Sequence, residues 1–494
     1  MNRLLLVSLL VGCATAPIAI EPVVTRPNPG LEAAPQKRVL AELPAALDVD
    51  PKAIAVAPLD VKVTRPERYE LPNGLVVYLM EDHASPLVLV RTLVPVGAVD
   101  EPTDRLGVSG IAAELVTSGG AGTRTPEQLD ELLEFHAADL GAGAADEYSQ
   151  VSLSVRSQDL AALFPVFADV VLRPRFDGAR FEVARSRVLE SIKRRNDRPD
   201  GLAARALNKA LYGTDTLLGR EASEATVKAI TPDDVKKLHA KWTPKTARLV
   251  ITGDFDRAAV KLLIDRSFAA WKGGAPPARN FGSAGPPARR VIVIPRAVAQ
   301  VKVRIGGAGW ARRSPDEYPM RLVNTALGSF GVGRLYREIR DERGLAYSAS
   351  SSVGGGPTFG QFTASFDTRP QQAVQALEVA LEVLERTGGA EALTKAELAT
   401  ATDMATNTFA FRFDSASRIA WERALSEFFG YDDDYLDRYR ERIGQVTAAQ
   451  VNAAAAKLTK KDALQIVVVG PKDALGDLSR FGPVTIIEDV DAFR

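Results

Sequence analysis

The sequence predicts an α+β protein of two homologous domains, each an antiparallel sheet with helices packed on one face. Three observations lead to this fold class. Strand patterns and helix patterns alternate along the chain and then repeat in the same order. A stretch of residues in the first half returns in the second half at a constant spacing. The chain of 494 residues is also too long for one hydrophobic core.

The repeat can be followed residue by residue. The stretch 231–235, Thr-Pro-Asp-Asp-Val, matches the stretch 447–451, Thr-Ala-Ala-Gln-Val, and the two lie 216 residues apart. A lysine follows each stretch at the same distance, and the next strand pattern ends in glycine, at Gly253 and Gly470. This period is too long for a solenoid repeat and indicates two related domains.

The elements of the first half follow from apolar alternation for strands and from helical periodicity for helices. Its strands are expected at 75–79, 87–94 and 247–252, and its helices at 107–117, 126–138, 158–172, 178–195 and 222–243. In the second half, strands are expected at 291–294, 301–305, 346–353, 358–366 and 464–469. Helices are expected there at 316–328 and 333–342, followed by a long helical region over 370–457.

The N-terminus has the pattern of a bacterial lipoprotein signal. A short apolar run after Arg3 ends in Leu-Val-Gly-Cys at 10–13, and Cys13 is the only cysteine of the chain. We expect cleavage before Cys13 and lipid attachment to its thiol; an ordinary signal peptide with a chance cysteine is the alternative. Ala14 follows, rather than aspartate, which favours anchoring in the outer membrane with the body of the protein in the periplasm.

These signals divide the chain into five segments. Residues 14 to about 65 are rich in proline and alanine and predict an extended tether, although a generic disordered N-terminus has the same composition. The predicted segments are a signal peptide at 1–12, a tether at 13–65, an N-terminal domain at 66–272, a linker at 273–288 and a C-terminal domain at 289–494.

Composition excludes several classes of function. Lysine plus arginine equals aspartate plus glutamate, at 62 each, so charge gives no reason to expect nucleic-acid binding. One cysteine rules out an internal disulfide and a cysteine-based zinc site. The only histidines are His83, His136 and His239, and no two have the sequence spacing of metal ligands.

A family resemblance rests on two phrases in the first half. The opening phrase Leu-Pro-Asn-Gly-Leu at 71–75 and the helix start Gly-Val-Ser at 107–109 resemble the pitrilysin or insulinase-type zinc peptidases, the inverzincins. The resemblance covers about residues 66–494. In active members that helix carries His-x-x-Glu-His, in which two histidines bind zinc and the glutamate activates the bound water.

The zinc motif itself is missing here. Its positions are occupied by Gly110, Ala113 and Glu114, while the apolar stripe of the helix is intact. The resemblance places the third zinc ligand at Glu190, on the predicted helix 178–195, where it is either a remnant ligand or an ordinary solvated carboxylate. We therefore expect this chain to bind no metal.

A second motif of the family is retained. The run 327–348, from Leu-Gly-Ser-Phe to Ala-Tyr-Ser, resembles the C-terminal signature in which an arginine and a tyrosine contact substrate near the zinc. Arg340 and Tyr347 hold those two positions. Alternatively, Arg340 pairs with a helix carboxylate and Tyr347 packs in a sheet. Arginine and tyrosine both donate hydrogen bonds to a carbonyl oxygen or a developing oxyanion.

Together these motifs predict a chain that has no peptidase activity alone. The resemblance implies a clamshell half that pairs with a homologous, zinc-bearing subunit, binds peptide or unfolded protein through Arg340 and Tyr347, and reaches the membrane through its N-terminal lipid. The alternative is a scaffold or assembly protein of the same fold. A scaffold has no need of the Arg340 and Tyr347 pair, which favours the first hypothesis.

Overall fold

The computed structural model describes residues 64–275, 278–282 and 288–493. The predicted signal peptide, the lipidation site Cys13 and all but the last two residues of the predicted tether lie outside the described residues. Below, the N-terminal half means residues 66–272 and the C-terminal half means residues 289–494. No helix within the described ranges combines the length and the apolar character that crossing a membrane requires.

Each half contains one sheet of six strands. Across the first sheet the order is β1 (Glu67–Glu70), β2 (Val76–Glu81), β6 (Arg248–Gly253), β3 (Leu87–Val94), β5 (Ser149–Arg156) and β4 (Asp139–Ala144). Across the second it is β14 (Val484–Ile486), β7 (Arg290–Pro295), β13 (Gln465–Gly470), β8 (Val301–Ala308), β12 (Gln361–Thr368) and β10 (Ala346–Val353). Two short strands, β9 (Trp310–Ala311) and β11 (Gly355–Gly356), pair with each other.

The two sheets repeat one topology. Strands β2, β6, β3, β5 and β4 correspond in order to β7, β13, β8, β12 and β10. Within both sets the first pair is parallel and the other pairs are antiparallel. The sheets differ at one edge, where β1 is antiparallel to β2 but β14 is parallel to β7. The predicted repeat of predominantly antiparallel sheets is confirmed.

The matching stretches at 231–235 and 447–451 begin equivalent helices, α8 (Pro232–His239) and α15 (Ala448–Leu458). The hydroxyl of Thr231 accepts a hydrogen bond from the backbone N–H of Asp234, and the hydroxyl of Thr447 accepts one from that of Gln450; the N···O distance is 3.3 Å in both. In each case the side chain three residues on accepts the threonine N–H in return. The single helix predicted at 222–243 is two helices, α7 (Glu224–Lys228) and α8, because Pro232 starts a new helix.

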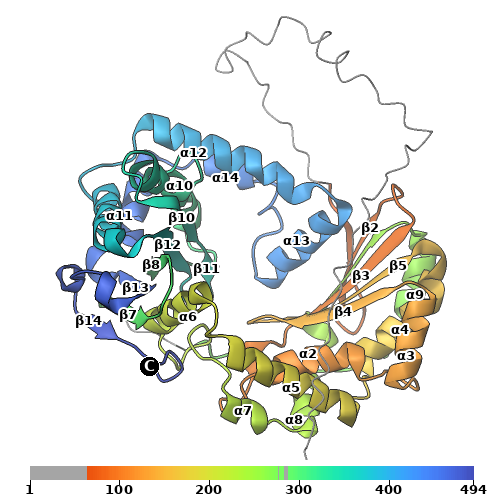
Figure 1. Ribbon diagram of the computed structural model, residues 1–494. Helices are drawn as coiled ribbons and strands as arrows, with labels where there is room; N and C mark the ends of the chain where they lie inside the picture. Colours follow the sequence, from red (N-terminus) through yellow and green to blue (C-terminus); the bar gives the residue numbers. More distant parts are fainter. Residues whose placement is uncertain (1–63, 276–277, 283–287, 494) are drawn as a thin grey trace, which may run out of the picture. The chain divides into compact units, whose positions relative to one another are not determined.

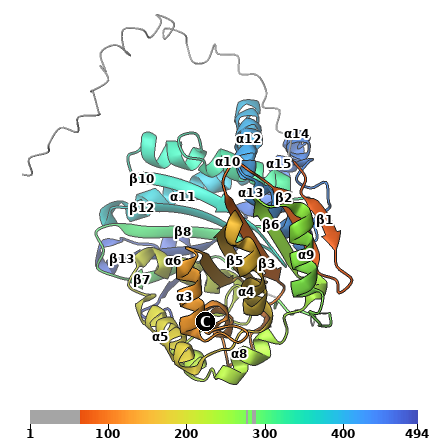
Figure 2. The ribbon, with the colours of Figure 1, turned by 90° about the vertical axis from the view of Figure 1, so that its right-hand side faces the viewer.

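One face of each sheet carries the main helical layer (Figures 1 and 2). The N-terminal half also contains α2 (Val108–Ser118), α3 (Pro126–Phe135), α4 (Leu160–Leu172), α5 (Gly178–Arg194) and α9 (Arg257–Phe268). The C-terminal half also contains α10 (Glu317–Gly328), a π-helical turn (Tyr336–Asp341), α11 (Ala373–Gly388), α12 (Lys395–Thr408) and α14 (Tyr439–Gly444). The largest buried clusters lie between each sheet and this layer.

The other face of each sheet is covered by a helix of the opposite half. Helix α6 (Pro199–Tyr212), from the N-terminal half, packs on β8 and β13 of the second sheet. Helix α13 (Ala416–Phe428), from the C-terminal half, packs on β2 and β6 of the first sheet. The central strands are therefore buried on both faces, which accounts for the unbroken apolar runs at 291–294 and 466–469.

Candidate functional site

Helix α2 is intact, but the residues at the first two positions of the zinc motif, Gly110 and Ala113, cannot bind a metal. Gly110 is exposed, and a Cβ added there would meet no atom within 4 Å. Ala113 is buried and offers only a methyl group. The helix start is held by Glu101, whose carboxylate accepts the N–H groups of Gly107 at 3.0 Å and Ser109 at 2.8 Å. A carboxylate at this end also complements the helix dipole.

The two remaining carboxylates of the degenerate zinc site are paired with arginines of α5. Glu114 Oε1 accepts a hydrogen bond from Arg187 at 2.6 Å, and Glu190 Oε1 accepts one from Arg194 at 2.7 Å. Arg187 was not among the residues predicted from the sequence. Its position three residues before Glu190, on the same helix, was the available signal, because residues three apart lie on one helix face.

This arrangement does not fit a zinc ion. Zinc sites use three or more histidine, cysteine or carboxylate ligands, and here glycine and alanine replace two positions while guanidinium groups hold the two carboxylates. Among residues 64–275, 278–282 and 288–493, no group of three or more such side chains is arranged to hold a metal.

The three histidines lie in separate surroundings. His83 Nδ1 is 2.7 Å from Asp254, and His136 Nδ1 is 2.9 Å from Asp159. The His239 ring contacts the carbonyl of Val171 at 2.9 Å, and burial lowers its pKa. None of these contacts joins one histidine to another.

Arg340 and Tyr347 lie together in the C-terminal half. The guanidinium carbon of Arg340 is 4.7 Å from the ring centre of Tyr336 and 5.1 Å from that of Tyr347. Its closest carboxylate contact, to Asp341, is 3.9 Å long. Tyr347 is 80% exposed, so it does not pack into the sheet. The arginine therefore stacks on two rings rather than forming a tight ion pair.

Two backbone irregularities place this pair. Arg340 belongs to the π-helical turn Tyr336–Asp341, where the Glu342 N–H donates to the Arg337 carbonyl at 2.9 Å. Strand β10 has a register shift between Ala346 and Ala349, so one extra residue is accommodated opposite β12. Such turns and bulges redirect side chains, and here Tyr347 and the next residue, Ser348, are both exposed.

An exposed aromatic ring, that of Phe330, lies next to Tyr336, one of the rings that Arg340 contacts. Phe330 is 75% exposed and its ring packs edge-on against Tyr336, with ring centres 4.9 Å apart. Phe330 and Tyr336 both lie in the run 327–348, and the sequence predicted no separate role for either ring. Within the described part of the chain, no hydrogen bond, ion pair or ring contact connects this group with the degenerate zinc positions on α2 and α5.

The sequence matches two family models that follow one another along the chain. The model described as insulinase (peptidase family M16) matches residues 76–222, and the model described as peptidase M16 inactive domain matches residues 229–404. The chain belongs to the insulinase-type peptidase family M16. The description "inactive domain" concerns the second match, whereas the degenerate zinc positions lie in the first.

Curated relatives and solved structures agree with this assignment. An uncharacterized zinc protease of Mycobacterium tuberculosis is 27% identical over 408 residues, covering 80% of this chain and 91% of the relative. The uncharacterized zinc protease YmxG of Bacillus subtilis is 21% identical, covering 80% and 96%.

The solved structures show the same fold. The peptidase M16 inactive domain structure from Pseudomonas fluorescens has a TM-score of 0.74 at 23% identity, covering 83% of this chain and 98% of that one. A Helicobacter pylori protease has a TM-score of 0.74 at 19% identity, covering 83% and 100%. The periplasmic protease PqqL of Escherichia coli has a TM-score of 0.69 at 17% identity, covering 86% of this chain and 47% of PqqL.

Proposed function

We propose that this chain is the non-catalytic, substrate-binding subunit of a heterodimeric periplasmic zinc endopeptidase that acts on peptides or unfolded protein. The partner is a homologous subunit that carries His-x-x-Glu-His and the zinc. The observation that carries the proposal is the contrast between two sites of one chain. The two carboxylates at the zinc positions, Glu114 and Glu190, are held in ion pairs with arginines, whereas Tyr347 is exposed and lies against Arg340.

The stacked geometry suits hydrogen bonding to a peptide. Rings on Tyr336 and Tyr347 contact the guanidinium of Arg340 and restrict its position, and no carboxylate holds it closely. A positioned guanidinium donates to a carbonyl oxygen with less entropy lost on binding than a free one. The hydroxyl of Tyr347 supplies a further donor. Under this proposal the zinc belongs to the partner subunit, and this chain contributes only hydrogen-bond donors to the bound peptide.

The test is peptide cleavage by this chain and its most similar homologue with the zinc motif, assayed separately and mixed. We expect cleavage to appear or rise sharply on mixing, and Arg340→Ala to lower it by about 100-fold, as the loss of one transition-state donor does. Arg337→Ala is the matched control. Arg337 is exposed on the same π-helical turn, and its nearest carboxylate, Glu342, is 3.7 Å away.

The outcomes separate the two hypotheses. If the homologue is fully active alone, or if Arg340→Ala and Arg337→Ala have equal effects, the chain is a scaffold of the same fold. Cleavage with stoichiometric zinc by this chain alone would contradict both.

The periplasmic placement has its own test. We propose that Cys13 carries the lipid that anchors the chain in the outer membrane. Cys13→Ser should move the protein from the membrane fraction to the soluble fraction without altering activity of the mixed subunits. A protein that stays membrane-bound after this change would contradict lipid anchoring at Cys13.

A further inference from the structure

The two exchanged helices form seams of different character. The α6 seam, between α6 and the second sheet, buries thirteen side chains of the described residues in one cluster. They are Leu202, Ala203, Ala206, Leu207, Ala210, Leu211, Tyr212, Ile292, Ile294, Val467, Val469, Ile487 and Val490. The α13 seam, between α13 and the first sheet, buries five: Val76, Tyr78, Val250, Ala420 and Ala424. Because burial of apolar surface is the main stabilising term, the α6 seam is the stronger one.

The α6 seam includes the end of the chain. After β14, the Ile487 N–H donates to the Val293 carbonyl at 2.8 Å, which extends the edge of the second sheet. Ile487 and Val490 are then buried in the α6 cluster, at 6% and 0% exposure. Residues 487–491, here called the C-terminal strap, thus lie across the junction between the halves.

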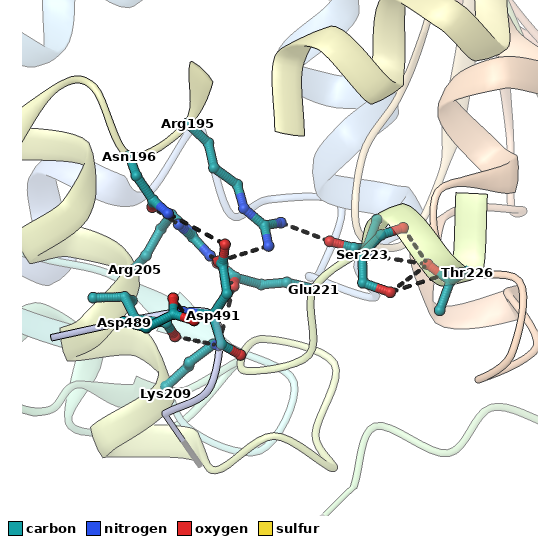
Figure 3. Close-up of polar contacts among 11 residues, drawn as sticks. Arg195, Asn196, Arg205, Lys209, Glu221, Ser223, Thr226, Asp489 and Asp491 are labelled. Carbon is teal, nitrogen blue, oxygen red and sulfur yellow. Dashed lines mark hydrogen bonds and ion pairs between the residues drawn. The ribbon is translucent and has the colours of Figure 1, made fainter. Parts of the chain in front are cut away.

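Polar side chains of the N-terminal half bind the strap: Arg195, Asn196, Arg205 and Lys209 (Figure 3). The carboxylate of Asp491 accepts hydrogen bonds from Arg195 at 2.6 Å, from Arg205 at 2.5 Å and from Asn196 at 3.2 Å. The ammonium of Lys209, which is only 6% exposed, donates to the Val490 carbonyl at 2.8 Å. Arg195 lies just after α5, and Arg205 and Lys209 lie on α6, so the strap fixes both helices.

Glu221 of the N-terminal half balances the positive charges of Arg205 and Lys209 beside the strap. Glu221 receives two hydrogen bonds from Arg205, both 2.7 Å long, and lies 3.4 Å from Lys209. Burial alone would raise the pKa of Asp491, but the hydrogen bond from Arg205 and the charge of Arg195 lower it below its ordinary value. The pKa of Glu221 is lowered in the same way by Arg205 and Lys209. The carboxylates of Asp491 and Glu221 therefore stay charged at neutral pH, and the hydrogen bonds from Arg195 and Arg205 to Asp491 are kept.

The α13 seam borders two cavities, and some of its ion pairs involve more exposed arginines. Arg65, 52% exposed, pairs with Asp433 and Asp437, and Arg68, 42% exposed, pairs with Glu427, whereas Arg205 in the α6 seam is 14% exposed. One of about 620 Å³ is lined by Arg423, Ser426 and Glu427 of α13 together with Arg68 and Tyr78 of the first sheet. Another, of about 360 Å³, lies between Phe428 and the residues around Arg248. Charged side chains line both cavities, and cavities of this size have room for water, which can replace protein hydrogen bonds when a contact opens.

We propose that the C-terminal strap makes the α6 seam the fixed junction of the molecule, so that the two halves part at the α13 seam. The motion separates α13 from β2 and β6 while α6 stays on the second sheet. Asp491 is the residue that fastens the strap, through Arg195, Asn196 and Arg205. This inference is independent of the proposed peptidase role.

Hydrogen exchange of the full mature chain, followed by mass spectrometry, tests the proposal. In the unaltered protein, amides of α13 should exchange earlier than amides of α6, because partial opening exposes only the α13 seam. Asp491→Asn should speed exchange of α6 about fivefold, the effect of losing the charge of a partly exposed ion pair. The matched control is Asp489→Asn. It makes the same change two residues away, where, among the described residues, the carboxylate accepts a hydrogen bond only from the Asp491 N–H of the strap itself.

A second variant covers the case in which Asp491→Asn does not fold. Arg195→Gln removes one partner of Asp491 and leaves Arg205 and Asn196 in place, so a smaller increase in α6 exchange is expected. The proposal fails if α6 exchanges as early as α13 in the unaltered protein. It also fails if the variants at Asp491 and Arg195 leave α6 exchange unchanged, or if Asp489→Asn has the same effect as Asp491→Asn.

Discussion

Glu427 of α13 connects the C-terminal half to three residues of the N-terminal half. Its carboxylate accepts hydrogen bonds from Arg68 at 2.7 and 3.0 Å, from Arg248 at 3.2 Å and from the hydroxyl of Tyr78. The side chain is 30% exposed. Glu427→Gln removes the charge that balances two guanidinium groups. Breaking a fully buried pair costs about 3–5 kcal/mol, and with this exposure we expect about 2–3 kcal/mol.

Thermal unfolding measures this effect. With a fall of about 2 °C per kcal/mol for a large chain, Glu427→Gln should lower the melting temperature at pH 7 by about 4–6 °C. The matched control is Glu422→Gln on the same helix. Glu422 is 29% exposed and pairs with one partner, Arg412 of its own half. A surface pair contributes about 0.2–1 kcal/mol, so this control should lower the melting temperature by about 2 °C or less.

The effect should also depend on pH. Burial by itself would raise the pKa of Glu427, but the hydrogen bonds from Arg68 and Tyr78 and the charge of Arg248 lower it below its ordinary value. A lowered folded-state pKa stabilises the fold above the unfolded value of about 4.3, and this contribution is lost as the pH falls through the folded value. The gap between Glu427→Gln and the unaltered protein should therefore close at low pH. Equal shifts for the two variants at pH 7, or a gap that persists in acid, would refute this reasoning.

Three further predictions concern the candidate sites. Combining Gly110→His, Ala113→Glu and Glu114→His should give a chain that retains about one zinc per molecule after dialysis, since α2 is intact and Glu190 remains on α5. Adding Arg187→Ala to this triple variant should tighten zinc binding about fivefold in a chelator competition, because the repulsion of a nearby guanidinium weakens zinc binding by on the order of 1 kcal/mol. An unchanged zinc affinity would mean that Arg187 does not approach the site. Tyr347→Phe should change stability by less than about 0.5 kcal/mol in denaturant unfolding, as expected for an exposed side chain, but should lower cleavage by the mixed subunits.

Local sequence patterns predicted much of the fold. Strand β3 spans the predicted residues 87–94, and the capped helices that begin after Thr231 and Thr447 lie in equivalent places of the two sheets. Strand β4 was missed because its residues, Asp-Leu-Gly-Ala-Gly-Ala, are poor strand formers that pair only at an edge. Helix α6 was also missed. Its buried stripe includes the small residues Ala203 and Ala206, and the two strands that it contacts, β8 and β13, begin only at Val301 and Gln465, far along the chain.

The candidate site was predictable to a similar extent. The family resemblance identified Gly110, Ala113 and Glu114 as the motif positions, because the motif occupies a short run of consecutive residues on one helix. The ion pair between Glu114 and Arg187 joins residues 73 positions apart, and no local pattern announces it. The stacking of Arg340 depends on the π-helical turn and on the bulge in β10, two backbone irregularities that sequence periodicity does not indicate.

The exchange of α6 and α13 has a consequence for biosynthesis. During translation the first sheet can form soon after residue 253, but the helix that covers its outer face ends at Phe428 and emerges much later. Until then Val76, Tyr78 and Val250 lack their cover, so the nascent N-terminal half exposes an apolar patch that is prone to non-native contacts. The same exchange should make the finished protein tolerant of a nick between the halves. Each fragment would keep a helix embedded in the other, and the two would stay together after proteolysis of the predicted linker 273–288.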